Sequence, residues 1–403
     1  MHSTINRSLY PCIFALALPL AVAACADETQ SPADAEAPAG DLLAVGDNRD
    51  LAVRGDFAMH VEGRDFAVAD LAIPADLSAP ADLATIPDLA SPCGVCPKNY
   101  ACGSANGIPV CRAPSGIPLF NHIFVILMEN TSFSTLDKSN NTPFIHQIKS
   151  KWAYGSDYHG VTHPSLPNYI ALTSGSPQNI ECDCEPTGSA CNIFNCNALI
   201  HSCGCGQKVK NLADDLEAAG LPWRAYAEDM GAPCNPKDDG LYAVRHVPFL
   251  YYDNILSDKA RCQSHVVDFL NFAVDLPKAP AFNFIAPNLT NDMHDPFPAG
   301  DTNLANGDAF LAKQIPPILA SAAWKDNGLL VVVWDEDDLS GVLAKDDPIP
   351  IFVLSPLTKQ NGFGSAVKAD HYALLATFED GLNLPRLGNA AGAKPLTDYF
   401  PAK

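Results

Sequence analysis

A serine lies between two prolines in Pro164-Ser165-Leu166-Pro167, directly before a segment of helical character. The prolines lack an amide proton and fix φ, so a regular strand cannot pass through this stretch. We expect a helix over 168–174, with Gly175 as its left-handed C-cap and Ser165 just ahead of it. There the helix dipole and free backbone N–H groups favour a bound phosphate and lower the pKa of a hydroxyl nucleophile. The alternative is that Ser165 only caps the helix.

Polar side chains follow several predicted strands at the point where each strand ends. Continuous apolar runs indicate buried strands at 123–128, 281–286, 329–334 and 349–354. The polar groups that follow them are Glu129-Asn130, Asp292-Met293-His294-Asp295, Asp335-Glu336 and, after a loop, Asp370-His371. Carboxylate, amide and imidazole groups form a ligand set for a divalent cation, which neutralises clustered carboxylates. Any one motif is equally well explained by helix caps and loops, but four of them together with Ser165 favour a site.

A metal beside a serine predicts phosphoryl chemistry. The cation lowers the pKa of the hydroxyl group and neutralises charge that develops on the phosphoryl group. Ser165 would attack phosphorus to form a phosphoserine, which water then hydrolyses. His163, His246 and His294 are the candidates for binding phosphoryl oxygens or protonating the leaving group. For His246, which lies among apolar residues, a buried structural role is an equal alternative.

The elements that position these residues alternate along the chain. Helical patterns at 209–219 and 309–323 separate the predicted strands. Buried strands that alternate with helices predict a parallel sheet covered on both faces, with ligands at the carboxyl ends of the strands. We therefore predict that residues 118–403 form one α/β sandwich, and the 47% hydrophobic content is ample for its core.

The N-terminus is a predicted export signal. Arg7 precedes an apolar run at about 13–24, which is too short to span a membrane comfortably. The run ends in Val22-Ala23-Ala24-Cys25, which resembles a bacterial lipobox. We predict a lipoprotein signal peptide at 1–24 and lipidation of Cys25, which would anchor the exported protein to a membrane without spanning it. The alternative is an ordinary signal peptide, with Cys25 incidental.

Residues 25–92 form a predicted disordered spacer. Ala, Asp, Pro and Leu recur in imperfect units such as Ala79-Pro80-Ala81-Asp82-Leu83, with few aromatic residues. The formal net charge of the chain is −21, and residues 26–92 contribute 14 acids against 3 bases. The acidity therefore belongs largely to the spacer. No basic patch is present to release counterions, so we expect no nucleic-acid partner.

The 14 cysteines agree with export, because disulfides persist outside the reducing cytosol. Residues 93–117 hold four cysteines and predict a small disulfide-rich module, with half of a zinc site as the alternative. A second group crowds an insertion at about 180–206, and Cys234 and Cys262 lie beyond it. We expect disulfide bonds in the insertion, with a metal cluster as the alternative.

Residues 118–390 resemble the phosphoesterase family of bacterial and fungal acid phosphatases and phospholipases C, which is similar in turn to the alkaline phosphatase superfamily. The matching stretches are 122–130, 163–169, 291–295, 333–336, and His371-Tyr372 with Glu379. The resemblance implies a three-layer α/β/α sandwich with a mainly parallel sheet. It implies Ser165 as the nucleophile and Glu129, Asn130, Asp335 and Glu336 as metal ligands. Asp292, His294 and His371 would complete the site; we place Asp292 and His371 with the metal, and the division among the three stays open.

The predicted function is an exported, metal-dependent phosphomonoesterase of acid phosphatase type that acts on a phosphate ester. Ca, Mg, Mn and Zn all suit the oxygen-rich ligand set. One alternative is a phosphodiesterase of phospholipase C type. The other is a surface lipoprotein that binds a ligand on the same fold without catalysis. The expected location is the periplasm or the cell surface through the lipid anchor, with secretion as the alternative.

Overall fold

The computed structural model describes residues 91–187, 205–294, 301–338 and 347–402. All of them belong to one compact unit, which spans residues 80–403. The predicted signal peptide, the lipidation at Cys25, the spacer and the centre of the Cys-rich insertion lie outside the described residues. Within the described ranges, none of the helices has the length and apolar character needed to cross a membrane.

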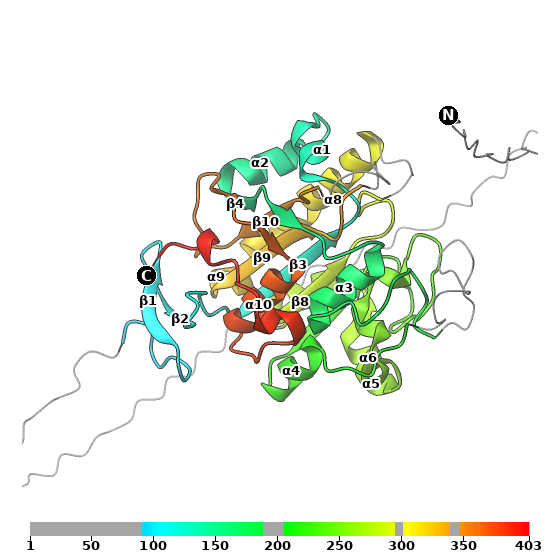
Figure 1. Cartoon of the computed structure of the whole chain (residues 1–403), viewed down its shortest axis with the longest axis horizontal. Coiled ribbons are helices and arrows are strands. Elements are labelled where there is room, and N and C mark those ends of the chain that lie inside the picture. Colours follow the sequence, from blue (N-terminus) through cyan, green and yellow to red (C-terminus); the bar gives the residue numbers. More distant parts are fainter. Residues whose placement is uncertain (1–90, 188–204, 295–300, 339–346, 403) are drawn as a thin grey trace, which may run out of the picture. The chain divides into compact units, whose positions relative to one another are not determined.

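An eight-stranded sheet forms the centre of this unit (Figure 1). Its strands, in spatial order, are β11 (Gly364–Ser365), β4 (Ala153–Gly155), β10 (Ile351–Leu354), β9 (Gly328–Trp334), β3 (His122–Met128), β8 (Phe282–Ala286), β6 (Trp223–Ala227) and β7 (Val266–Asp268). Among these strands β10 alone is antiparallel to its neighbours. The mainly parallel sheet and all four predicted strands are confirmed.

Helices cover both faces of the sheet, which confirms the predicted α/β/α sandwich. Phe282 of β8 packs against Phe378 on one face, whereas Phe124 of β3 packs against Phe272 on the other. The helices are α1 (Phe133–Lys138), α2 (Pro143–Lys151), α3 (Ser165–Ser174), α4 (Leu212–Ala218), α5 (Asp253–Leu256), α6 (Lys259–His265), α7 (Phe272–Asp275), α8 (Asp301–Ala320), α9 (Ala322–Lys325) and α10 (His371–Gly381). Short 3-10 helices are η1 (Val244–His246), η2 (Pro248–Tyr251), η3 (Phe269–Asn271), η4 (Leu276–Lys278), η5 (Gly388–Ala391) and η6 (Thr397–Tyr399).

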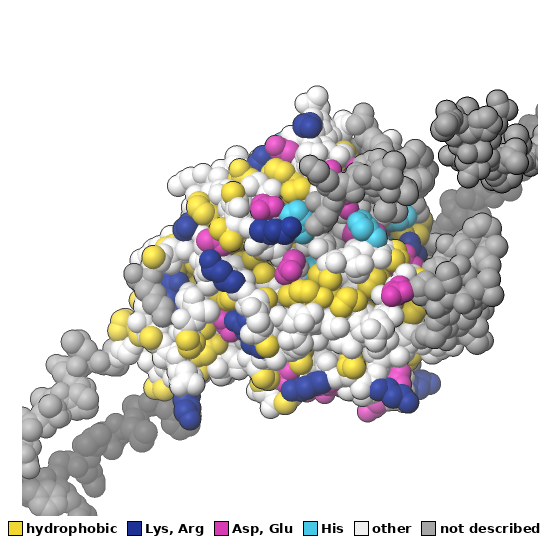
Figure 2. Space-filling view, viewed as in Figure 1, with side chains coloured by type: hydrophobic (Ala, Val, Ile, Leu, Met, Phe, Trp, Pro, Cys, Tyr) yellow, Lys and Arg dark blue, Asp and Glu magenta, His cyan; other side chains and the backbone are white. Residues whose placement is uncertain are grey.

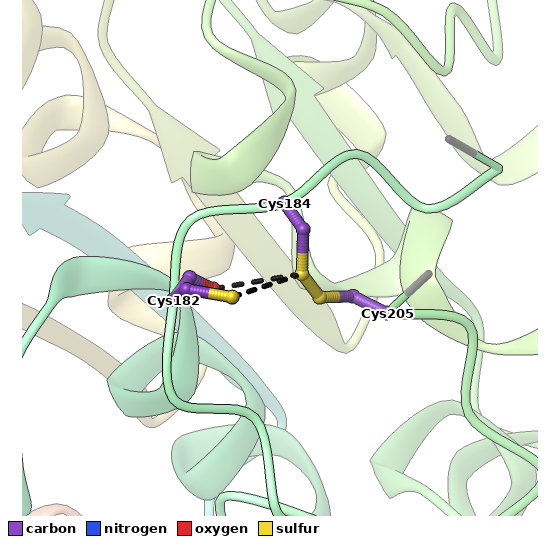
Figure 3. A group of neighbouring side chains, drawn as sticks. All are labelled: Cys182, Cys184 and Cys205. Carbon is purple, nitrogen blue, oxygen red and sulfur yellow. Dashed lines mark hydrogen bonds between the residues drawn. A yellow bond between two sulfur atoms is a disulfide. The ribbon is translucent and has the colours of Figure 1, made fainter. Parts of the chain in front are cut away.

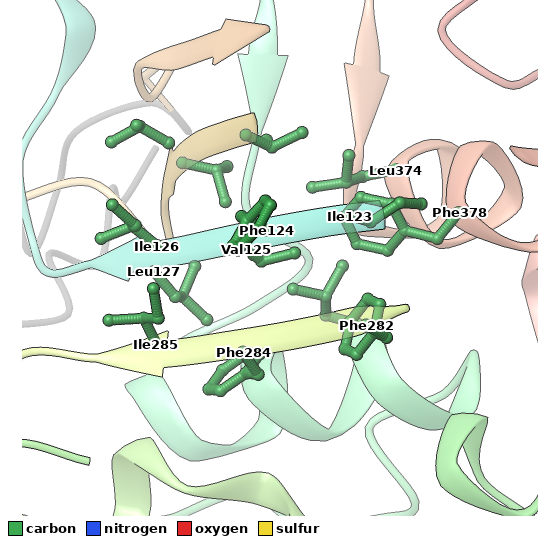
Figure 4. Close-up of a cluster of buried hydrophobic side chains, with 14 of the residues drawn as sticks. Ile123, Phe124, Val125, Ile126, Leu127, Phe282, Phe284, Ile285, Leu374 and Phe378 are labelled. Carbon is green, nitrogen blue, oxygen red and sulfur yellow. The ribbon is translucent and has the colours of Figure 1, made fainter. Parts of the chain in front are cut away.

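The core lies on the central strands. Every residue of β8 and β9 is buried, as is all of β3 after His122. Figure 4 shows side chains of β3 and β8 packing together, with Leu374 and Phe378 of α10 against them. These strands read as continuous apolar runs because both of their faces are covered. The rigid centre fixes the strand ends that carry the site.

The direction of β10 corrects one expectation. The sequence interpretation placed all four polar motifs at the same edge of a parallel sheet, including Asp370-His371 after the last strand. Because β10 runs the other way, its carboxyl end lies at the opposite edge. The chain returns through β12 (Ala369–Asp370), which pairs in parallel with β5 (Tyr158–His159). This short pairing, not the end of β10, places His371 next to Asp335.

The cysteines of the N-terminal module form two disulfides, Cys93–Cys102 and Cys96–Cys111. They brace a hairpin of β1 (Ala101–Ala105) and β2 (Ile108–Arg112). Because all four thiols are oxidised, the zinc alternative is wrong for this module. Asn106 at the hairpin turn donates a 2.8 Å hydrogen bond to the carbonyl of Pro356, so the hairpin contacts the sandwich directly.

Candidate active site

The carboxyl ends of three adjacent parallel strands meet at one edge of the sheet. The backbone N–H of Glu129, after β3, donates to the carbonyl of Asp292, beyond β8, at 2.8 Å. The N–H of Asp335, after β9, donates to the carbonyl of Met128 at 3.0 Å. These bonds continue the sheet just past its strands and bring the side chains of Glu129, Asp292 and Asp335 to one place. The expectation that these polar motifs share an edge is therefore confirmed for three strands.

Ser165 is the first residue of α3 and is buried. Its hydroxyl donates a 2.9 Å hydrogen bond to Glu129 Oε2 and lies 3.4 Å from both Asn130 Oδ1 and Glu336 Oε1. The cap position belongs to Pro164, which offers no side-chain hydrogen bond. Ser165 thus does not cap its own helix, and its hydroxyl faces the carboxylates. The predicted C-cap at Gly175 is confirmed, with φ at 75°.

Asn168 holds the loop that precedes Ser165. Its Oδ1 accepts hydrogen bonds from the N–H groups of Val161 and Thr162 at 2.8 and 3.1 Å. Its Nδ2 donates to the carbonyl of Thr162 at 2.7 Å. The loop also passes close to the end of β9, because a Cβ on Gly160 would lie 2.9 Å from the carbonyl oxygen of Asp335. A glycine is needed for this approach, which fixes the position of the serine relative to the strand ends.

His246 lies between two carboxylates and is fully enclosed. Its Nε2 is 3.2 Å from Glu129 Oε1, and its Nδ1 is 3.4 Å from Asp292 Oδ2. The ring stacks on Tyr169 with a centroid distance of 5.3 Å, and the Tyr169 hydroxyl donates to Glu129 Oε1 at 2.5 Å. Burial lowers the pKa of His246 well below its usual value. The side chains of Ser165, Glu129, His246 and Asp292 therefore form one continuous line of contacts.

His163 lies on the open side of the site. Its Nδ1 is 2.7 Å from Glu336 Oε2 and its Nε2 is 3.0 Å from Asp337 Oδ1, with 41% of the side chain exposed. The hydrogen bond to Glu336 raises the pKa of His163 to about 9 against the opposing effect of partial burial. Figure 2 shows histidine side chains reaching the surface beside acidic groups on this face. His163 thus presents a positive charge next to the serine.

The two remaining predicted histidines lie at the margin of the cluster. In His371, Nε2 is 2.7 Å from the backbone oxygen of Asp335 and Nδ1 is 2.9 Å from the Tyr158 hydroxyl. Both ring nitrogens therefore have protein partners, and the ring supports the Asp335 backbone. The backbone N–H of His294 donates to Asp292 Oδ1 at 2.8 Å, and its side chain is an electrostatic neighbour of His246.

The charges of the cluster fit a divalent cation. Burial raises the pKa of Glu129 and of Asp335, and neighbouring carboxylates raise both further. Asp335 Oδ2 is buried and, within the described ranges, accepts no hydrogen bond. Buried carboxylates in such numbers are costly without a neutralising charge, and hard oxygen ligands suit a divalent cation. Glu129, Asn130, Asp335 and Glu336 can supply these oxygens around the Ser165 hydroxyl.

Four residues that shape the site had no individual role assigned from the sequence: Tyr169, Asp183, Arg245 and Asp337. Tyr169 and Asp337 lie in the serine motif and in the acidic run after β9, which the sequence interpretation had singled out. Burial lowers the pKa of Arg245, but the carboxylates of Glu129 and Asp183 outweigh burial and raise it. Arg245 thus remains a half-buried positive charge beside the acidic cluster. Arg245 directly precedes the candidate His246 in the sequence, and this position could have identified it as a site residue. Asp183 lies in the Cys-rich insertion, where no pattern ties it to the serine loop.

The Cys-rich insertion contains a disulfide between Cys184 and Cys205, and a second one joins Cys234 to Cys262. Cys182 is disulfide-bonded as well. Figure 3 shows the sulfur of Cys182 beside the Cys184–Cys205 bond. Although these three sulfur atoms lie within 4.8 Å of one another, they are oxidised and are not thiolate ligands. The expected disulfides are confirmed for these residues.

The chain is similar to a known protein family and to several known proteins. The sequence profile of the phosphoesterase family matches residues 137–385. A phosphatidylinositol-3-phosphatase from Mycobacterium tuberculosis is 30% identical over 72% of this chain and 85% of that protein. An acid phosphatase from Aspergillus fumigatus is 26% identical over 67% of this chain and 56% of that protein. A solved protein of the alkaline phosphatase superfamily from Vibrio parahaemolyticus superposes with a TM-score of 0.47 at 11% identity, over 73% and 74% of the two chains.

The chain belongs to the phosphoesterase family. It is a phosphoric-ester hydrolase, as the resemblance in its motifs predicted.

Proposed function

We propose that this protein is a metal-dependent phosphomonoesterase of acid phosphatase type that works through a phosphoserine. The observation that carries the proposal is the Ser165 hydroxyl, which is the first side chain of α3 and lies within 2.9–3.4 Å of Glu129, Asn130 and Glu336. The hydrogen bond from this hydroxyl to Glu129 Oε2 fixes the orientation of the serine side chain. The hydroxyl also lies at the N-terminus of a ten-residue helix, where an anion is stabilised.

In the proposed reaction the Ser165 oxygen attacks phosphorus, and the bond between phosphorus and the leaving oxygen breaks. The hydroxyl proton of Ser165 points to Glu129 Oε2. His163 and Arg245 place positive charge near the incoming phosphoryl group. His163 or His294 binds a phosphoryl oxygen or protonates the leaving oxygen. Water then attacks the phosphoserine, releases phosphate and restores the serine.

We place the divalent cation on Glu129, Asn130, Asp335 and Glu336. When bound, it lowers the pKa of the serine hydroxyl and neutralises charge on the phosphoryl group. We propose that His246 and Asp292 support Glu129 and do not bind the cation themselves, since the His246 ring lies between the carboxylates of Glu129 and Asp292. His371 holds the Asp335 backbone and is not included among our proposed ligands. Such supporting contacts orient the ligands of a metal site.

A phosphomonoester is favoured over a diester by one specific observation. The M. tuberculosis relative is named a phosphatidylinositol-3-phosphatase, and its name describes removal of a monoester phosphate from a lipid headgroup. We therefore include phosphatidylinositol 3-phosphate among the candidate substrates. A phosphodiesterase of phospholipase C type is the second candidate, and a non-catalytic binding protein is the third.

The test is hydrolysis of p-nitrophenyl phosphate and bis-p-nitrophenyl phosphate by the purified protein, with and without a chelator. The proposal predicts preference for the monoester, loss of turnover with chelator, and loss of turnover in Ser165→Ala. Ser174→Ala, at the other end of α3, is the matched control and should retain activity. A strong preference for the diester supports the second candidate. Folded, metal-loaded protein without turnover supports the third.

We also propose that the protein is exported and held at a membrane by lipid on Cys25. The lipobox-like sequence Val22-Ala23-Ala24-Cys25 supports this. In a bacterial host, the wild-type protein should fractionate with membranes and take up labelled palmitate, whereas Cys25→Ser should do neither. Labelling that is equal in both proteins would contradict lipidation at this cysteine.

A further inference from the structure

The first turn of α3 carries an unusual cap, which comes from far along the chain. The first N–H groups of a helix have no acceptor within the helix and need one from elsewhere. In α3 the cap residue is Pro164, which provides no side-chain acceptor, and Ser165 directs its hydroxyl to Glu129. The N–H of Leu166, adjacent to the serine, instead donates to Asp183 Oδ1 at 2.9 Å. The acceptor therefore lies in the Cys-rich insertion.

Asp183 is held in place from both sides along the chain. Cys182 before it and Cys184 after it are disulfide-bonded, and Cys184 pairs with Cys205. The carbonyl of Cys184 accepts a 2.7 Å hydrogen bond from the hydroxyl of Tyr251, a fully buried residue of η2. The short segment around Asp183 is thereby fixed to the body of the protein while its carboxylate contacts α3.

Asp183 also lies in the electrostatic environment of the site. Burial raises the pKa of Asp183, and the hydrogen bond from the Leu166 N–H, together with the nearby Arg245 and His294, offsets only part of that rise. A carboxylate that accepts a backbone N–H at a helix N-terminus makes a charge-assisted bond and interacts favourably with the helix dipole. Because Leu166 follows Ser165 directly, this bond fixes the turn from which the serine hydroxyl reaches Glu129.

We propose that Asp183 is a positioning residue for Ser165, and that the Cys184–Cys205 disulfide holds it there. The proposal rests on the proposed function in that Ser165 is the nucleophile. The Cys-rich insertion is then part of the catalytic architecture, because it supplies the external acceptor for the nucleophile turn. A loss of this contact lets the serine depart from its alignment, and small misplacements of reacting groups are costly to rate.

The experiment compares Asp183→Ala, Asp183→Asn and Glu185→Gln in the full-length protein. Asp183→Ala removes the acceptor and should lower kcat by about 10- to 100-fold with little change in KM. Asp183→Asn keeps an oxygen that can accept from Leu166 and should restore most of kcat. Glu185→Gln removes a negative charge from the same segment and should match the wild type. Equal losses in Asp183→Ala and Asp183→Asn, accompanied by a raised KM, would overturn the positioning role.

Two further readouts keep the test independent of folding and of the proposed function. Cys184→Ser/Cys205→Ser keeps the Asp183 side chain but removes the disulfide that holds its segment, so kcat should fall in this variant as well. Hydrogen exchange of the peptide around Leu166 should be faster in Asp183→Ala than in Glu185→Gln, whether or not the protein turns over. Unchanged exchange and unchanged kcat would each overturn the proposal. If the wild type were inactive but the exchange difference were as expected, the contact between Asp183 and Leu166 would stand and the proposed phosphatase function would be wrong.

Discussion

The hydroxyl of Ser165 donates a hydrogen bond to Glu129, a residue 36 positions earlier in the chain. The bond joins the start of α3 to the end of β3, the strand at the centre of the sandwich. Glu129 also accepts from Tyr169 and contacts His246, so its two oxygens connect the serine to the buried part of the site. Changes at Glu129 or its partners should therefore affect metal content and rate together.

Glu129→Gln should lose both bound metal and activity. The substitution keeps the size of the side chain but removes the negative charge that faces Ser165 and the proposed cation. Mutation of a residue that hydrogen-bonds to a metal ligand typically lowers metal affinity by about 10- to 100-fold. Loss of a ligand itself should therefore lower metal affinity by at least about 100-fold. Metal content after dialysis and a metal titration provide the measurement. Glu217→Gln, a change outside the cluster, is the control; wild-type metal affinity in Glu129→Gln would contradict the assignment.

Tyr169→Phe should reduce activity while the protein remains folded. Phenylalanine keeps the ring that stacks on His246 but removes the hydroxyl that donates to Glu129. We expect a decrease of about 10- to 100-fold in metal affinity or kcat/KM, because this hydroxyl orients Glu129, one of the proposed metal ligands. Tyr252→Phe is the matched control, since the Tyr252 hydroxyl pairs with Thr173 away from the carboxylates. The role of Tyr169 would be rejected if both variants behaved alike.

Glu379 should make the stability of the fold depend on pH. Its side chain is buried, with Oε1 accepting from the N–H of Leu387 at 2.7 Å, and burial raises its pKa from 4.5 to about 8. Between these values the folded state binds a proton that the unfolded state does not. The free energy of unfolding should therefore fall as pH rises through this window, and Glu379→Gln should reduce the fall.

Urea unfolding of the wild type and Glu379→Gln at about pH 5 and about pH 9 measures this effect. The stability of the variant relative to the wild type should increase toward the higher pH. Glu217→Gln again serves as a control, because Glu217 has partners at the surface. The wild type should lose stability between the two pH values. If Glu379→Gln lost the same amount, Glu379 would be excluded as the source of this pH dependence.

Removal of the Cys234–Cys262 disulfide should affect stability more than chemistry. The crosslink spans a sequence separation of 28 residues, for which chain entropy predicts a contribution of about 3.6 kcal/mol. Cys234→Ser/Cys262→Ser should therefore unfold at a lower urea concentration and keep most of its kcat under native conditions. An unchanged unfolding midpoint would contradict a stabilising role for this crosslink.

The parts of the site that follow strands were predictable from the sequence. Glu129 and Asp335 come directly after apolar runs, and parallel strands bring such residues to a common edge. The position of His371 was not predictable in the same way, because an apolar run does not reveal the direction of its strand. The antiparallel β10 leads away from the edge, and only the β5–β12 pairing returns the chain to Asp335.

Contacts between segments that lie far apart in the chain could not be predicted from the sequence either. Periodicity reports burial but does not specify which tyrosine donates to a carboxylate, and Tyr169 was therefore read only as part of a motif. Asp183 had even less signal, since an acidic residue between two cysteines is an ordinary loop feature. Its contact with Leu166 depends on how the disulfide-bonded segment folds back on α3.

The most direct test of the central claim is to trap the covalent intermediate. The wild-type protein is mixed with a radiolabelled phosphomonoester, stopped in acid within the steady state, and digested for mass spectrometry. The account predicts phosphate on Ser165 in the wild type and on no residue in Ser165→Ala, which should also lack turnover. Phosphate on a different residue, or full turnover in Ser165→Ala, would contradict Ser165 as the nucleophile.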